Sequence, residues 1–294
     1  MNEVLRRGFI ELHAAIFLAG FTGVLGRAIT LNESLLVFWR VVIAVAGILL
    51  IFLWQKKRFL LPVRDALRIA EVGFMLAAHW VLFYGSIKYA NVSIGVVCFA
   101  SVGFFTAVLD PVMSKRAFSA REVLFSLLTI AGIALIFHFD IRHQTGIVLG
   151  VASSVVFAVM SIEKRRISVS YEPMTFVFYE MTSCLAAMAL ITAFYMSGQA
   201  PSAWLPDARD AFYLAVLGLA CTVGLQYLNL KALQALSAFT VNLSYNLEPV
   251  YSIALAMVIF HEAREVNFAF YLGLVLIIAS VVLQSAFHAK NRAS

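Results

Sequence analysis

The chain has 294 residues, of which 62% are hydrophobic and 13% are charged, and its mean hydropathy is +0.91. A soluble globular domain is about 45–50% apolar and about 25% charged, so this composition excludes both a soluble domain and a disordered chain. A membrane-crossing helix needs about 20 apolar residues. Ten such helices with short connections account for nearly the whole chain, which indicates a polytopic membrane protein with little outside the bilayer.

Ten apolar segments follow one another along the chain. They are predicted at 11–29, 35–54, 67–88, 92–112, 123–139, 146–162, 174–195, 211–230, 236–260 and 268–287. All ten are expected to be helices, because lipid offers no hydrogen-bond partner to an open backbone and the alternation of a barrel strand is absent from the sequence. The predicted fold class is an all-α polytopic membrane protein with ten transmembrane helices.

Basic residues predict the orientation of these helices. With the N-terminus in the cytoplasm, 16 of the 22 Lys and Arg residues fall on that side, Lys164 among them, and five fall on the other. The remaining one, Arg40, lies within the second segment. The positive-inside rule therefore predicts that both termini are cytoplasmic and that the protein is a multi-pass protein of the cell (inner) membrane. This asymmetry also explains the net charge of +6 without a nucleic-acid partner.

The two halves of the chain resemble each other. At an offset of 143, the matches are 84–88 with 227–231, Ser101 with Ser244, and the identical Ala-Arg-Glu-Val of 120–123 and 263–266. An offset of 140 aligns Phe38-Trp39-Arg40 with Phe178-Tyr179-Glu180. Because five helices is an odd number, the second copy enters the membrane upside down, an arrangement that recurs in secondary transporters. The sequence thus predicts two inverted five-helix repeats, residues 1–140 and 141–294.

The second half also carries a resemblance to a known family. The residues concerned are the turn Lys231–Ser237, Leu247-Glu-Pro-Val250, His261-Glu262 and a closing helix that begins near Gly273. With ten spans in about 300 residues, the chain resembles the EamA-like branch of the drug/metabolite transporter (DMT) superfamily. The first half departs from that pattern, since its fourth segment has no midspan proline. The resemblance implies two inverted repeats and export or exchange of amino acids, metabolites or drugs.

Polar and aromatic side chains at mid-depth predict a transport cavity, because such groups are expensive to expose to lipid. The expected lining residues are His79, Trp80, Ser101, Gln226, Tyr227, Asn242, Tyr245 and Asn246. This mixture of rings and amides suits a small polar organic solute. For His79, a hydrogen bond to a neighbouring helix is as good an interpretation as a lining role.

The ninth segment holds the densest midspan polarity. Asn242, Tyr245 and Asn246 share one helix face, and Pro249 is expected to free the carbonyl of Tyr245. Glu248, beside this turn, is the first candidate for a proton carrier, with His79 second. Two alternatives remain open: Glu248 is a protonated structural acid, or the protein is an uncoupled facilitator.

Two further charged residues lie inside predicted spans. Arg40 and Glu180 occupy equivalent positions in the second and seventh segments, each within two turns of a membrane face. Long side chains at such positions commonly extend to the interface. Both are therefore interpreted as snorkelling residues and not as an ion pair.

The predicted function is secondary transport of a small polar or amphipathic metabolite, such as an amino acid, with export favoured. The alternatives are a membrane-embedded enzyme acting on a lipid-linked substrate and a structural or receptor subunit. His261-Glu-Ala-Arg-Glu265 lacks the second histidine of a zinc hydrolase motif, and the three cysteines form no paired pattern. No catalytic residue, metal or cofactor is predicted. The expected partners are a small-molecule substrate and lipid, and a monomer is compatible with the sequence, which leaves the substrate and the coupling ion open.

Overall fold

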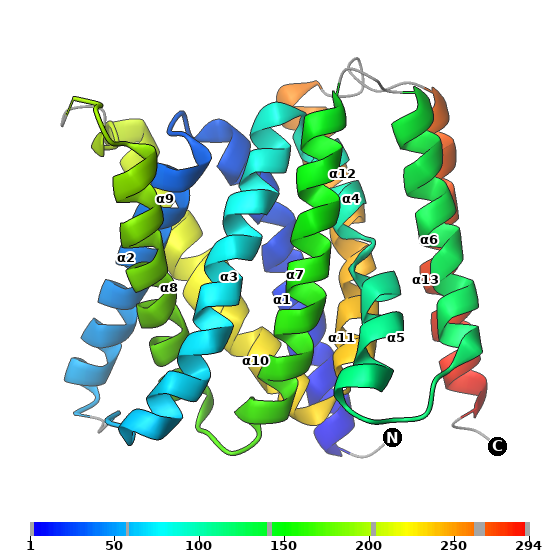
Figure 1. Cartoon of the computed structure of the whole chain (residues 1–294), viewed down its shortest axis with the longest axis horizontal. Helices are drawn as coiled ribbons and strands as arrows, with labels where there is room; N and C mark the ends of the chain where they lie inside the picture. Colours follow the sequence, from blue (N-terminus) through cyan, green and yellow to red (C-terminus); the bar gives the residue numbers. More distant parts are fainter. Residues whose placement is uncertain (1–2, 57–58, 140–142, 201–203, 262–267, 292–294) are drawn as a thin grey trace.

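The computed structural model describes residues 3–56, 59–139, 143–200, 204–261 and 268–291. The description does not include the side chain of Asn246 or several side chains of the helices at Ala120–Phe139 and Phe268–Asn291. The helical segments are α1 (Glu3–Ala28), α2 (Glu33–Trp54), α3 (Val63–Tyr89), α4 (Val92–Phe99), α5 (Val102–Met113), α6 (Ala120–Phe139), α7 (Gln144–Ser168), α8 (Pro173–Tyr195), α9 (Ala208–Gly218), the π-helical turn η3 (Leu219–Gly224), α10 (Leu225–Ala235), α11 (Ala238–Ser244), the 3-10 turn η4 (Tyr245–Leu247), α12 (Glu248–Phe260) and α13 (Phe268–Asn291). They run side by side as one bundle (Figure 1).

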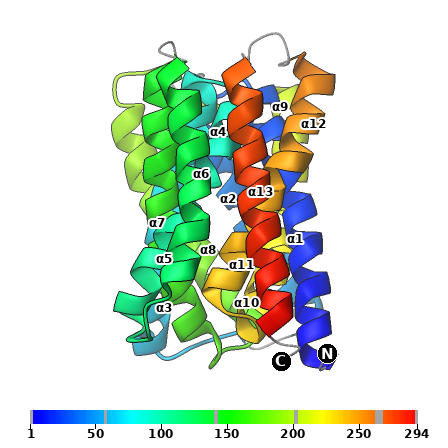
Figure 2. The ribbon, with the colours of Figure 1, turned by 90° about the vertical axis from the view of Figure 1, so that its right-hand side faces the viewer.

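Eight segments of the described chain are long and apolar enough to cross a membrane. They are α1, α2, α3, α4 with α5, α7, α8, α9 through α10, and α11 through α12. The other two segments expected to cross correspond to α6 and α13, helices of 20 and 24 residues. These two pack against each other at one edge of the bundle (Figures 1 and 2).

Short polar side chains set where several helices begin. The side chains of Asn32, Asn91, Asp207 and Ser237 each accept a hydrogen bond from the backbone N–H three residues later, at 2.7–3.0 Å. Such N-caps satisfy backbone donors that have no partner within the helix. They fix the first turns of α2, α4, α9 and α11.

Three segments that the sequence predicts as single helices are not continuous α-helices: the eighth passes through the π-helical turn η3, and the fourth and the ninth are interrupted near their middle. The fourth is divided into α4 and α5, and the ninth passes from α11 to α12 through η4. Ser101 and Ser244, which the offset of 143 pairs, lie at these two interruptions. Each hydroxyl donates to a carbonyl of its own preceding turn, at 2.7 and 2.9 Å, a bond that often bends helices. The two interruptions therefore fall at equivalent positions of the predicted repeats.

The expectation that Pro249 leaves the carbonyl of Tyr245 free is wrong. Pro249 has no N–H to donate to it, but the N–H of Glu248 donates to this carbonyl instead. The chain makes this bond by tightening into a 3-10 turn, a common solution at helix ends. The carbonyl of Tyr245 is therefore not an unoccupied acceptor beside Glu248.

Contacts between helices link the two halves in a reciprocal way. The first helix, α1, packs against α10 and α12, and α7 packs against α3, α4 and α5. The first segment of each predicted repeat thus contacts the third and fourth segments of the other. Figure 1 shows that α1 begins on the face where α13 ends, whereas α7 begins on the opposite face.

A glycine in each half permits two helices to cross closely. A methyl group added at Gly73 of α3 would collide with the carbonyl of Glu180 on α8. One added at Gly218 of α9 would lie 3.0 Å from the carbonyl of Arg40 on α2. Since Arg40 and Glu180 are paired by the offset of 140, the two crossings occupy equivalent places in the two halves.

Replacing Gly73 by Ala should destabilise the protein by about 1–3 kcal/mol, because the new methyl group must push the backbone of α8 away. The measurement is the unfolding temperature of the purified protein in detergent. Gly224→Ala is a matched control, since the nearest atom to its added methyl is 3.7 Å away. Equal unfolding temperatures for the two variants would contradict the close crossing.

Candidate functional site

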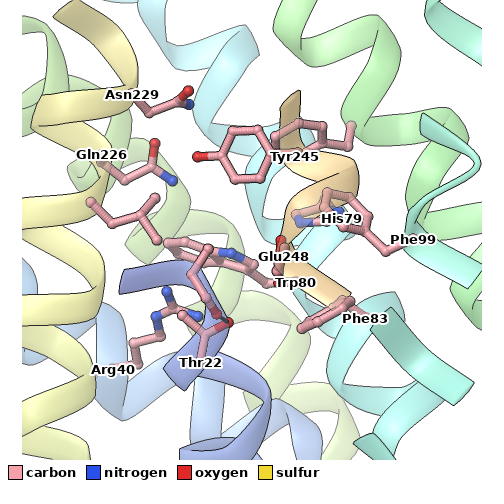
Figure 3. Close-up of a pocket in the computed structure, with 13 residues that line it drawn as sticks. Thr22, Arg40, His79, Trp80, Phe83, Phe99, Gln226, Asn229, Tyr245 and Glu248 are labelled. Carbon is pink, nitrogen blue, oxygen red and sulfur yellow. Dashed lines mark hydrogen bonds between the residues drawn. The ribbon is translucent and has the colours of Figure 1, made fainter. Parts of the chain in front are cut away.

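A cavity lies between helices that come from both halves of the chain (Figure 3). Its volume, measured over the centres of water-sized molecules, is about 40 Å³, which holds only a few such molecules. The first half contributes Ala19, Thr22, Arg40, His79, Trp80, Phe83 and Phe99, and the second half contributes Phe157, Leu225, Gln226, Asn229, Tyr245 and Glu248. A solute of the size of an amino acid requires these walls to move apart.

Arg40 supplies a positive charge to the cavity. Its three bonds go to neutral groups: the hydroxyls of Thr222 and Tyr84, both at 2.6 Å, and the carbonyl of Cys221 at 3.0 Å. The guanidinium also stacks over Trp80, 4.0 Å from the ring centroid. The side chain is only 2% exposed, so its interpretation as a snorkelling residue is wrong. The π-helical turn η3 provides two of the three acceptors.

Aromatic rings form one side of the cavity. Phe99 lies at the centre of this group, with ring centroids 5.3 Å from His79, 5.7 Å from Phe83 and 5.0 Å from Phe157. His79 Nδ1 also lies 2.8 Å from the hydroxyl of Ser153 on α7. His79 therefore both lines the cavity and bonds to a neighbouring helix, the two interpretations that its sequence position left open.

Two polar atoms that face the cavity have no hydrogen-bond partner in the described part of the chain. Among the described residues, neither the hydroxyl of Tyr245 nor Oδ1 of Asn229 has a hydrogen-bond partner. Both side chains are buried and point into the same space as Gln226 (Figure 3). Buried polar atoms in folded proteins are nearly always bonded, so these two atoms are suited to a ligand or to water.

A buried ion pair lies directly behind Gln226. Lys164 Nζ is 2.8 Å from both carboxylate oxygens of Glu180 and 2.8 Å from Oε1 of Gln226. Lys164 and Glu180 are both 0% exposed. The prediction that Lys164 lies among the cytoplasmic loop residues is therefore wrong. The interpretation of Glu180 as a snorkelling residue is also wrong. The helix α7 continues to Ser168 and carries Lys164 on its inner face.

Five of the predicted residues meet in this cavity: His79, Trp80, Gln226, Tyr245 and Glu248. Asn242 lies elsewhere, where its amide accepts from Ser161 and donates to Thr106, both at 2.9 Å. These bonds join α11 to α7 and α5, and they leave the amide occupied.

The other three predicted residues are distributed differently. Ser101 is buried at the interruption between α4 and α5, with its hydroxyl bonded to its own turn. Tyr227 lies away from the cavity walls, where Lys231 is placed 5.4 Å from its ring centroid. The side chain of Asn246 lies outside the described part of the chain.

The bundle of apolar, membrane-length helices around a polar cavity defines a multi-pass membrane protein. The family model of the EamA-like transporter family matches the chain twice, over residues 6–138 and 144–286. The chain belongs to the EamA-like transporter family and is a transporter of the drug/metabolite type.

Comparison with solved structures supports the fold. A structure titled "Crystal structure of protein" is similar to this chain with a TM-score of 0.71 and 17% sequence identity, and the match covers 97% of this chain and 98% of that one. At this identity the likeness concerns the fold alone. No curated protein matches the chain.

Proposed function

We propose that the protein is a secondary transporter that exports a small polar or amphipathic metabolite, such as an amino acid, by alternating access between two inverted halves. One observation carries this proposal: both family-matched segments contribute walls to a single buried cavity. A site shared by two halves becomes open to either side of the membrane when the halves rock against each other.

The chemistry of the walls favours a zwitterionic or amphipathic solute. Arg40 offers a cation for an acidic group, and the oxygen atoms of Asn229 and Tyr245 that have no partner among the described residues offer acceptors for an amino group. The rings around Phe99 suit an apolar portion of the solute. Trp80, His79, Gln226, Asn229 and Tyr245 are the remaining residues that we assign to binding.

The proposed topology has ten crossings, with α6 and α13 as the fifth and tenth, and repeats at 1–140 and 141–294. The equivalent interruptions at Ser101 and Ser244 and the opposite starting faces of α1 and α7 support inversion. Removing Lys164 from the loop residues leaves 15 basic residues against five, so cytoplasmic termini in the inner membrane remain our proposal. A C-terminal reporter active only outside the cytoplasm would overturn it.

Replacing Trp80 by Ala should impair export and leave the amount of protein in the membrane unchanged. The ring lines the cavity and supports the guanidinium of Arg40, so its loss alters the binding surface without introducing a charge. The test compares metabolites inside and outside cells that lack the protein, make the wild type or make the variant.

The expected result is a solute that accumulates outside only with the wild type. Trp54→Ala is the matched control, because Trp54, at the end of α2, is 83% exposed. Identical metabolite distributions in all strains would count against export.

A further inference from the structure

Gln226 connects the cavity to the buried ion pair behind it. Its Oε1 accepts from Lys164 Nζ at 2.8 Å, and the rest of its amide lies at the cavity wall. Lys164 in turn contacts both oxygens of Glu180. The three side chains come from α7, α8 and α10, so three helices hold one amide in place.

The chemistry of lysine dictates which end of that amide faces the cavity. An ammonium group has three donors and no acceptor, so only the oxygen of Gln226 can face Lys164. The amide nitrogen, with two N–H donors, is left on the cavity side, as Figure 3 shows. Turning the amide over would place N–H groups against the ammonium and leave Lys164 one acceptor short.

The ion pair itself is fully satisfied. The three donors of Lys164 meet three acceptor atoms, two on Glu180 and one on Gln226, each at 2.8 Å. Since Lys164 and Glu180 have opposite charges, the pair contributes no net charge to the site. Its effect on the cavity is therefore to orient Gln226.

We propose that Lys164 is a positioning residue that fixes Gln226 as a hydrogen-bond donor and thereby makes the cavity select solutes with an acceptor, such as a carboxylate, at this position. The proposal rests on the proposed transport function. A site built to bond an acceptor discriminates strongly against analogues that lack it, because its own polar group is then left unpaired.

The probes are L-phenylalanine and 2-phenylethylamine, which share the ring and the amine but differ in the carboxylate. Binding is measured on the purified protein in detergent by titration calorimetry. The replacement that releases Gln226 is Lys164→Met with Glu180→Met, since a buried ion pair is often replaced by apolar residues of similar volume without loss of folding.

The wild type should prefer phenylalanine, and this preference should fall about tenfold or more in the double variant. Gln226→Leu should cause a similar fall. When Lys164→Met and Glu180→Met are added to Gln226→Leu, the preference for phenylalanine should not fall further. A purely structural role of the ion pair does not predict this result. Arg165→Met, a control on the same helix that removes a bond to the carbonyl of Leu236, should preserve the preference.

A second arm needs no ligand. Gln226→Leu should lower the unfolding temperature in the wild-type background, because Lys164 loses an acceptor, but not in the double variant. The inference would be overturned if Gln226→Leu lowered the unfolding temperature equally in the wild type and in the double variant. It would also be overturned if the preference for phenylalanine fell further when all three replacements were combined. If the wild type binds neither probe, the proposed amino-acid substrate fails, and the thermal comparison alone decides the role of Lys164.

Discussion

Replacing Lys164 alone by Met should destabilise the protein by about 3–5 kcal/mol, because Glu180 is then left buried without its counter-charge. Both groups are 0% exposed, so water cannot replace the lost partner. Replacing both members by Met should restore most of the stability. The measurement is the yield of monodisperse protein in detergent, together with its unfolding temperature.

An exposed ion pair on the same helix provides the control. Arg166 and Glu163 are in contact at 2.6 Å, but Arg166 is 64% exposed, and such pairs contribute about 0–1 kcal/mol. Arg166→Met should therefore leave the yield and the unfolding temperature close to those of the wild type. If Lys164→Met is tolerated equally well, Glu180 does not depend on Lys164.

Replacing Glu248 by Gln should abolish concentrative, pH-dependent transport and preserve the exchange of substrate at equal concentrations. Glu248 is buried on the cavity wall, where it can exchange a proton when the cavity opens to either side. Glutamine keeps the shape and the hydrogen bonding of the acid but cannot release a proton. Reconstituted vesicles with an imposed pH gradient separate the two activities.

Glu11→Gln is the control for this experiment, since Glu11, in the N-terminal part of α1, forms ion pairs with Arg7 and Lys231 and lies outside the cavity lining. It should retain pH-dependent transport. If Glu248→Gln still concentrates substrate with the same pH dependence, the carrier is elsewhere or transport is uncoupled. His79→Gln then tests the second candidate in the same vesicles.

Hydropathy predicted the helices well, but it did not predict their interruptions. The second segment was expected at 35–54 and runs from Glu33 to Trp54. The fourth segment was expected to be continuous and is interrupted at Ala100 and Ser101. A hydropathy profile reports the transfer of side chains into lipid, whereas an interruption depends on backbone hydrogen bonds within one turn.

The position of polar side chains near the middle of apolar segments predicted part of the candidate site. Gln226 and Tyr245 were predicted to line one cavity because polar atoms at mid-depth need a partner, and both lie on the wall of the cavity in Figure 3. The same argument placed Asn242 in the cavity, but the amide of Asn242 forms its hydrogen bonds with Ser161 and Thr106 instead. Polarity predicts that a buried group has a partner, but the partner is decided by the packing of neighbouring helices.

Charges near the ends of apolar runs were the main source of error. Arg40 and Lys164 stand close to predicted membrane faces, where snorkelling or loop positions are the usual interpretation. The burial of Arg40 follows from its contact with η3, which is distant in sequence, and that of Lys164 follows from its contact with α8, the next helix of the chain. The alignment of Arg40 with Glu180 was the one available signal, since it placed two charges at equivalent helix crossings.

Solute counterflow in liposomes that contain only the purified protein tests the transport proposal most directly. The vesicles are loaded with the unlabelled solute that the cell comparison identifies and are diluted into a trace of the labelled solute. We predict transient accumulation of label above its equilibrium level by the wild type and by Trp54→Ala, and none by Trp80→Ala. Absence of counterflow with the wild type, or equal counterflow with Trp80→Ala, would contradict transport through this cavity.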